Sequence, residues 1–216
     1  NDGVLKNYDA TQTQTGWGST GLSSFSFENT GALDFDGADD YIEMPNESDF
    51  DFDRTDPFAI SIWMKSDQVT TGMDAYIFSK LYTPAWGDWA GYYIGCLTKT
   101  TGVIRWILEA NDWPSYNSVI DGTTKVNDNE WHHVTVMNEG IDGSASDMSI
   151  YIDGEKESVA VLSDDLGNRS IKNNTPLRLG WRGEDNWARK YNGLFDDTRI
   201  YNRTLADSEI SLLANG

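Results

Sequence analysis

Eight side chains in three segments of the 216-residue chain combine aromatic rings with polar groups that suit a sugar ligand. They are Trp86, Asp88 and Trp89 in the first segment, Asp112, Trp113 and Tyr116 in the second, and Arg182 and Trp187 in the third. A pyranose ring presents apolar C–H faces that lie on indole, while its hydroxyl groups need polar partners in fixed positions. The pattern predicts a carbohydrate-binding surface. The alternative is that these rings pack the ends of the fold.

Carboxylates gather at two other places, which are candidate sites for a divalent cation. Asp34, Asp36, Asp39 and Asp40 lie in one predicted hairpin, and Asp196 and Asp197 lie in the last predicted strand. Calcium takes six to eight oxygen ligands from carboxylates and carbonyls, so clustered aspartates suit it. The alternative is that the hairpin aspartates only make hydrogen bonds within their turn.

The sequence favours a protein without catalytic activity. It contains no Gly-x-Ser-x-Gly elbow, no His-Glu-x-x-His zinc motif and no phosphate-binding loop. His132 and His133 are adjacent in a predicted strand, so their side chains point to opposite faces and do not share a metal. We expect one of them to be packed and the other to lie on the surface. Cys96 is in a strand-like run and is expected to be a buried, inert thiol.

The composition narrows the range of partners. With 35 acidic and 16 basic residues the chain has a net charge of −19, so it repels the phosphates of nucleic acids and anionic membrane surfaces. The sequence lacks an apolar run of the length that a membrane span needs, and its single cysteine excludes an intrachain disulfide. The first residues resemble neither a signal peptide nor an initiator, so we expect a domain of a longer or processed protein.

Short stretches that alternate apolar and polar residues dominate the chain, and each predicts a β-strand. The clearest are 32–35, 41–44, 58–65, 75–79, 92–97, 103–108, 132–137, 148–152, 159–161, 177–180 and 193–201. Residues 208–213 have helical spacing and predict one short C-terminal helix, with Thr204 or Asp207 as its cap. Residues 81–91 and 109–126 are expected to be long loops. This spacing predicts a single all-β domain over 1–216, built as a sandwich or jelly roll, with 1–21 as an arm packed on it.

Five phrases, taken in order, resemble the laminin-G-like, concanavalin-A-like superfamily of lectins and glucanases. They are ALDFDGADDYIEMP at 32–45, FAISIWMK at 58–65, EWHHVTV at 130–136, IYIDG at 150–154 and NGLFDDTRIYNRTL at 192–205. The resemblance covers nearly the whole chain from residue 32. Members of the superfamily include pentraxins and carbohydrate-binding modules. It implies two antiparallel sheets that pack face to face.

The resemblance also implies a structural calcium ion, as in laminarinase-type hydrolases and their binding relatives. In them the acid that matches Asp196 is a ligand, helped by backbone carbonyls of the early turn. The first and last strands are commonly neighbours in this superfamily, so the two aspartate groups are expected to meet. The candidate ligands are Asp36, Gly37, Asp39, Asp196 and Asp197.

Together these features predict a non-catalytic carbohydrate-binding or adhesion module, with a glycan as partner and an extracellular, cell-surface or virus-particle location. One alternative is a structural domain of a surface or phage-particle protein that binds other protein chains. A second is a glycoside hydrolase or polysaccharide lyase on the same fold. The laminarinase-type hydrolases carry their carboxylates in a Glu-x-Asp-x-x-Glu run. Here Glu47-Ser48-Asp49 begins such a run, but Phe52 stands at the position of its second glutamate.

Overall fold

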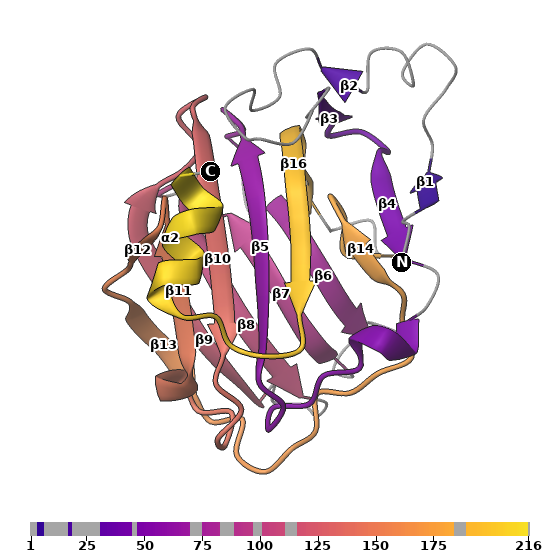
Figure 1. Cartoon of the computed structure of the whole chain (residues 1–216). Helices are drawn as coiled ribbons and strands as arrows, with labels where there is room; N and C mark the ends of the chain where they lie inside the picture. Colours follow the sequence, from indigo (N-terminus) through magenta and orange to yellow (C-terminus); the bar gives the residue numbers. More distant parts are fainter. Residues whose placement is uncertain are drawn as a thin grey trace.

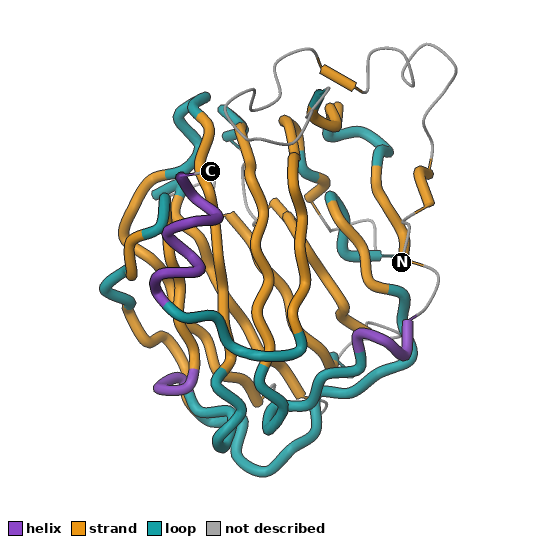
Figure 2. The backbone as a smooth tube through the Cα atoms, viewed as in Figure 1, coloured by secondary structure: helices purple, strands orange, loops and turns teal. Residues whose placement is uncertain are grey.

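The computed structural model describes residues 4–6, 17–18, 31–44, 47–69, 75–82, 89–96, 101–110, 116–183 and 189–215. Within them, two β-sheets pack face to face (Figure 1), and strands account for most of the trace (Figure 2). The strands are β1 (Val4–Lys6), β2 (Trp17–Gly18), β3 (Ala32–Asp36), β4 (Tyr41–Met44), β5 (Phe58–Lys65), β6 (Ala75–Tyr82), β7 (Ala90–Cys96), β8 (Val103–Ala110), β9 (Tyr116–Lys125), β10 (Trp131–Asn138), β11 (Met148–Ile152), β12 (Glu155–Lys156), β13 (Ala160–Asp164), β14 (Leu177–Leu179), β15 (Arg189–Lys190) and β16 (Asn192–Tyr201). The helical elements are η1 (Glu47–Phe50), η2 (Ala145–Asp147) and α2 (Asp207–Asn215).

Sheet A has the strand order β1-β4-β14-β6-β7-β8-β9-β13, with β15 beside β6, and sheet B has the order β12-β11-β10-β5-β16-β3-β2. Neighbouring strands are antiparallel except β15, which runs parallel to β6. The predicted two-sheet jelly-roll sandwich with a short C-terminal helix is therefore confirmed. None of the helices in the described part of the chain has the length and apolar character of a membrane span.

Alternating side chains of the two sheets build the core between them. On sheet B, Ile60 and Ile62 of β5 lie opposite Val136 and Val134 of β10, and all four are fully buried. Trp106 of sheet A is also fully buried, and its indole N–H donates a hydrogen bond of 3.1 Å to the Met137 carbonyl. Removing this apolar surface from water is the main stabilising contribution to such a fold.

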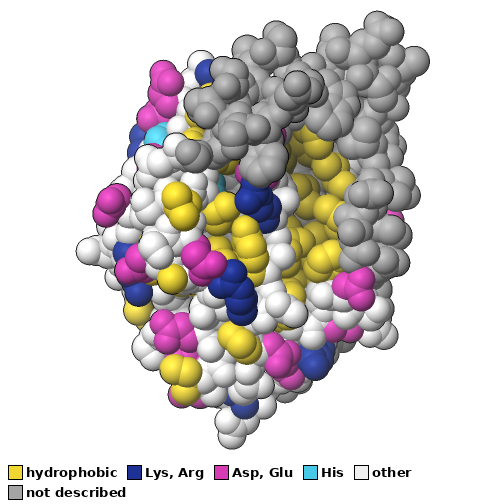
Figure 3. All heavy atoms as spheres, viewed as in Figure 1, with side chains coloured by type: hydrophobic (Ala, Val, Ile, Leu, Met, Phe, Trp, Pro, Cys, Tyr) yellow, Lys and Arg dark blue, Asp and Glu magenta, His cyan; other side chains and the backbone are white. Residues whose placement is uncertain are grey.

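The helix α2 lies against the outward face of sheet B, in front of β10 and β11 (Figure 1). Ile210 is its fully buried residue and packs on Met137 and Tyr151. Asp207, a predicted cap, is instead the first residue of the helix and accepts a hydrogen bond from the Tyr151 hydroxyl at 2.9 Å. The N-terminal turn is closed by Glu209, whose carboxylate accepts the Ala206 N–H at 2.9 Å. On this face acidic and basic side chains are interspersed (Figure 3).

Two sequence predictions change in the structure or are refined by it, and a third is confirmed. The stretch 109–126, expected to be a loop, contains the ten-residue strand β9, which pairs with β8 and β13. Its asparagine, glycine and threonines obscure the alternation, and its register with β8 shifts between Val103 and Arg105. Within the expected arm 1–21, β1 joins β4 and β2 joins β3. Cys96 is buried as predicted.

Candidate functional site

The outward face of sheet A carries an apolar cluster that is separate from the core between the sheets. It consists of Tyr76, Leu81, Tyr93, Ile107 and Val119, one or two from each of the four strands β6 to β9. Tyr93 lies opposite Ile107, and Ile107 lies opposite Val119, so these side chains point to the same face. All five side chains are buried, with exposures between 2% and 8%, whereas Trp89, which packs against them, is partly exposed.

Two of the predicted sugar-binding residues, Trp89 and Arg182, meet on this cluster. Trp89 is half-buried and packs against the cluster. The guanidinium carbon of Arg182 lies 5.0 Å from the Tyr76 ring centroid and 5.2 Å from the Trp89 ring centroid, and its Nη1 donates a hydrogen bond of 2.7 Å to the Tyr76 hydroxyl. A cation within about 6 Å of an aromatic centroid is attracted to the ring. Arg182 therefore helps to fix both rings on the face of the sheet.

The local sequence explains how Arg182 reaches this position. It lies in the turn after β14, between Gly180 and Gly183, which have φ values of 81° and 135°. A Cβ atom at Gly180 would come within 2.7 Å of the Phe35 ring, so this turn requires glycine. Only 3% of the surface of Arg182 is exposed. Arg182 therefore supports the aromatic rings, and its role as a polar partner of a sugar stays a prediction.

Two ion pairs lie on the same outward face. Arg105 donates hydrogen bonds of 2.7 and 2.9 Å to the two carboxylate oxygens of Asp121, the residue opposite it on β9. Arg178 donates one of 3.1 Å to Glu43, which is opposite it on β4. All four side chains remain partly accessible. Sequence reasoning missed these residues because each pair joins segments that only the strand register brings together.

A second aromatic contact, also missed, lies on the side of the face formed by β4 and β14. The half-buried Trp181 has its ring centroid 4.8 Å from that of Tyr41. Arg178 and Lys190 place their cationic groups 5.6 and 5.3 Å from the Trp181 centroid. The signal in the sequence was present, since Trp181 adjoins Arg182 in the third aromatic segment. The face therefore combines aromatic rings with cationic and carboxylate groups.

Of the other six predicted sugar-binding residues, only Tyr116 lies in the described part of the chain. Tyr116, at the start of β9, lies beneath Arg169, whose guanidinium carbon is 3.2 Å from its ring centroid. Tyr116 does not belong to the apolar cluster against which Trp89 packs. The remaining five lie outside the described residues: Trp86, Asp88, Asp112, Trp113 and Trp187.

The turn after β3 brings part of the predicted metal site together. Carboxylate oxygens of Asp36, Asp39 and Asp40 lie within 4.8 Å of one another. Gly37 has a φ of 74°, and a Cβ atom there would come within 2.9 Å of Asn192, so the turn requires glycine. Asp40 is buried, and this burial raises the pKa of its carboxyl group above the usual value. A divalent cation would offset that cost, so this donor set fits calcium.

The hydrogen bonds expected from the alternative interpretation are also present in this turn. Asp36 Oδ1 accepts the Ala38 N–H at 2.7 Å, and Asp40 Oδ2 accepts the Asp36 N–H at 3.0 Å. Each carboxylate has two oxygens with several lone pairs, so these bonds are compatible with a ligand role for the same groups.

Asp196 and Asp197 lie elsewhere on the outward face of sheet B. Asp36 is opposite Asn192, and Asp196 is four residues further along β16, roughly 13 Å at 3.3 Å per residue. Asp197 sits in a bulge with a φ of 43°, donates its N–H to Asp196 Oδ1 at 2.8 Å, and accepts a hydrogen bond of 2.8 Å from Arg199. The register therefore separates Asp36 from Asp196, and metal binding by either aspartate group stays a prediction.

Comparisons with known proteins identify the family and the fold. A sequence model of the concanavalin A-like lectin/glucanases superfamily matches residues 36–211. The binding domain of Paraclostridial Mosquitocidal Protein 1 superposes with a TM-score of 0.65 at 18% identity, over 100% of this chain and 48% of that one. The binding domain of botulinum neurotoxin DC in complex with SialylT gives 0.56 at 14%, over 99% and 46%. The heptameric SAP-like pentraxin from Limulus polyphemus gives 0.53 at 16%, over 74% and 70%.

These structures show a shared fold. The chain spans about half the length of the two toxin binding domains that it matches. No curated protein matches the sequence.

Proposed function

Because the chain belongs to the concanavalin A-like lectin/glucanases superfamily, we propose that it is a non-catalytic carbohydrate-binding module. Its ligand would dock on the outward face of sheet A. The observation that supports this most directly is Trp89, which is half-buried on an aromatic cluster and held beside Arg182. A fixed, partly exposed indole is the kind of surface on which the apolar face of a sugar ring stacks.

The polar groups beside the rings fit the same proposal. Arg105 with Asp121 and Arg178 with Glu43 present donors and acceptors in fixed geometry, because each side chain is held by its partner. Sugar hydroxyls are recognised by such pre-positioned groups. The charge of Asp121 is matched by a bidentate guanidinium, which suits binding better than the proton transfer that glycoside hydrolysis demands of a carboxyl pair.

One structural relative further supports the proposal of a glycan ligand. The botulinum neurotoxin DC binding domain, which shares this fold, is described in complex with SialylT. We extend a glycan partner to this chain, and with it an extracellular, cell-surface or virus-particle location, on the strength of the aromatic face and the shared fold. Fold alone does not determine the ligand, so the test must be made on the face itself.

The proposal is tested by screening the protein on a glycan array and measuring the dissociation constant of the best ligand for two variants. Trp89→Ala should weaken binding at least about tenfold, since truncating an aromatic anchor costs about 1.4 kcal/mol or more. Trp131→Ala is the matched control, because Trp131 is a half-buried tryptophan on sheet B, and it should bind as the parent protein does.

Three results would count against the proposal. A folded protein that binds no glycan and forms a regular oligomer would favour the structural or interaction domain instead. Equal losses from Trp89→Ala and Trp131→Ala would move the ligand away from sheet A. Release of reducing sugar ends from a bound polysaccharide would contradict the non-catalytic part and favour the hydrolase.

We further propose that the turn Asp36–Asp40 binds a structural calcium ion, on the strength of its three convergent carboxylates. A thermal melt in calcium should then exceed one in chelator. At a hundredfold excess over the dissociation constant the gain is about 2.7 kcal/mol, or roughly 5–10 °C for a domain of this size. Asp39→Asn should reduce that gain, whereas Asp196→Asn should leave it unchanged. The reverse order would place the ion on β16, and no calcium effect would exclude it.

A further inference from the structure

A layer of polar side chains lies on the outward face of sheet B, on the opposite side of the molecule from the proposed ligand face. Ser61 and Trp63 of β5 lie directly opposite Thr135 and His133 of β10. These residues alternate with Ile60, Ile62 and Val134 of the core, so their side chains point away from it. Ser61, His133 and Thr135 are nevertheless almost completely buried, with exposures of 1%, 1% and 0%.

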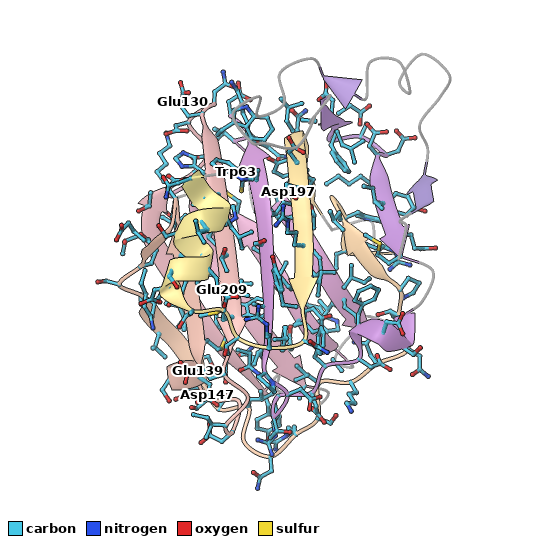
Figure 4. All side chains as sticks on the ribbon, in the orientation of Figure 1. Trp63, Glu130, Glu139, Asp147, Asp197 and Glu209 are labelled. Carbon is cyan, nitrogen blue, oxygen red and sulfur yellow. The ribbon has the colours of Figure 1, made fainter. Side chains whose placement is uncertain are left out.

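Neighbouring elements surround this layer. On one side α2 packs on the sheet through Ile210, which contacts Met137 and Tyr151 beside Thr135. The end of α2 lies against the turn after β11, where a Cβ atom at Gly154 would come within 3.2 Å of Ala214. On the other side is β16, and Figure 4 shows Trp63 and Asp197 at the same level of the two adjacent strands.

Three atoms of the layer are buried donors or acceptors that the protein itself does not satisfy. Ser61 Oγ, Thr135 Oγ1 and His133 Nδ1 have no hydrogen-bond partner within the described part of the chain. A buried polar group left in that state lowers the folding equilibrium constant by roughly tenfold, equivalent to about 1.4 kcal/mol. Three adjoining groups would lower it by roughly a thousandfold, which is a large share of the stability of a natural domain.

We propose that Ser61, Thr135 and His133 together bind one buried water molecule, which forms an internal hydration site on sheet B. Directly opposed residues have Cβ atoms about 4.5–5.5 Å apart. A single water oxygen between Ser61 and Thr135 therefore lies within about 2.8 Å of both hydroxyl oxygens. His133 is the next outward residue from Thr135 on β10 and provides the third partner. Buried waters in proteins make about three hydrogen bonds, the number that this layer offers.

The chemistry of the three groups suits water rather than a charged ligand. Burial lowers the pKa of His133 to about 4, so at neutral pH its imidazole is uncharged and has one N–H and one lone pair. The two hydroxyls each donate and accept, and they rotate to suit a partner. The nearest cation and anion on β16, Arg199 and Asp197, already pair with each other at 2.8 Å.

The test exploits the sign of a stability change. Thr135→Val and Ser61→Ala/Thr135→Val remove hydroxyls and change little else in shape. If water is bound, each variant leaves it with fewer partners, and the unfolding constant from urea titration should rise by about tenfold. If the layer is dry, removing unsatisfied hydroxyls makes the protein more stable, and an unchanged or smaller unfolding constant would overturn the proposal.

A direct count of long-lived internal water by oxygen-17 relaxation dispersion provides an independent measurement. The double variant should contain one such water fewer than the parent protein, and an equal count would overturn the proposal. Ser118→Ala is the matched control, because Ser118 is a fully buried serine whose hydroxyl donates to the Gly143 carbonyl at 2.7 Å. It should destabilise the protein without changing the water count.

Discussion

The two adjacent histidines are expected to titrate in opposite directions, and they are the only histidines in the chain. Burial lowers the pKa of His133 to about 4 from an ordinary value near 6.5. For His132 the pKa is raised, chiefly by its hydrogen bond to Asp153, at 2.8 Å from Nδ1, with Asp128 at 3.2 Å from Nε2. The difference follows from their positions on opposite faces of β10.

The sign of the stability change follows from linkage. Because the pKa of His133 is lower in the folded state, the unfolded chain binds more protons between about pH 6.5 and pH 4. The folded protein therefore loses stability as the pH falls through that window. The shift of about 2.5 pH units is worth about 3 kcal/mol at 1.36 kcal/mol per unit. His132 acts oppositely, since its stabilisation is complete below pH 6.5 and is lost as the pH rises through its raised pKa.

Two measurements test this reasoning: the pKa of each imidazole, and the free energy of unfolding as a function of pH. An NMR titration should show two imidazole signals, one with a midpoint near 4 and one above 6.5. Between about pH 7 and about pH 4, the free energy of unfolding in urea should fall by about 3 kcal/mol more for the parent protein than for His133→Asn. The comparison cancels the contribution of the carboxylates, because both proteins contain them. His132→Asn should change the slope in the opposite sense. A His133 midpoint at or above 6.5, or an equal loss in parent and His133→Asn, would refute the reasoning.

Two further predictions concern carboxylates that tie distant segments together. Glu157 accepts four hydrogen bonds of 2.6–2.9 Å from the backbone and hydroxyl groups of Thr123 and Thr124. Glu157→Gln should therefore lower the free energy of unfolding in urea by about 1–2 kcal/mol. The control Glu155→Gln, at an exposed neighbouring position, should change it little. Lys80 is 1% exposed and lies 2.7 Å from Asp51, so Lys80→Met should cost about 3 kcal/mol. Lys80→Met with Asp51→Asn should recover part of that loss, and additive losses would contradict the pairing.

The sequence was sufficient to predict the elements whose patterns are local. Alternation identified β5 and nearly all of β10, and with them the placement of His132 and His133 on opposite faces. Helical spacing identified α2. Each of these patterns repeats within a few residues, so it does not depend on which strand is the neighbour. The strand β9 was missed because its polar and glycine residues hide the same alternation.

The candidate sites depended on contacts that no local pattern reveals. Whether Asp36 meets Asp196 is decided by the register of β3 against β16, and a shift of four residues separates them. The burial of Arg182 depends on Tyr76, which is more than a hundred residues away in sequence. The sequence thus predicted which residue types were available, while strand register decided which of them act together.

The structure also explains why the two outward faces are assigned different roles. The outward face of sheet B is occupied by the chain itself, because α2 packs on Met137 and Tyr151 and the polar layer beside it is buried. The outward face of sheet A carries the partly exposed rings of Trp89 and Trp181 and two partly accessible ion pairs. A partly exposed aromatic group that is held in place by a buried cation loses little conformational entropy when a ligand arrives. Under the proposed function, a glycan that docks on sheet A meets a Trp89 ring that Arg182 has already fixed.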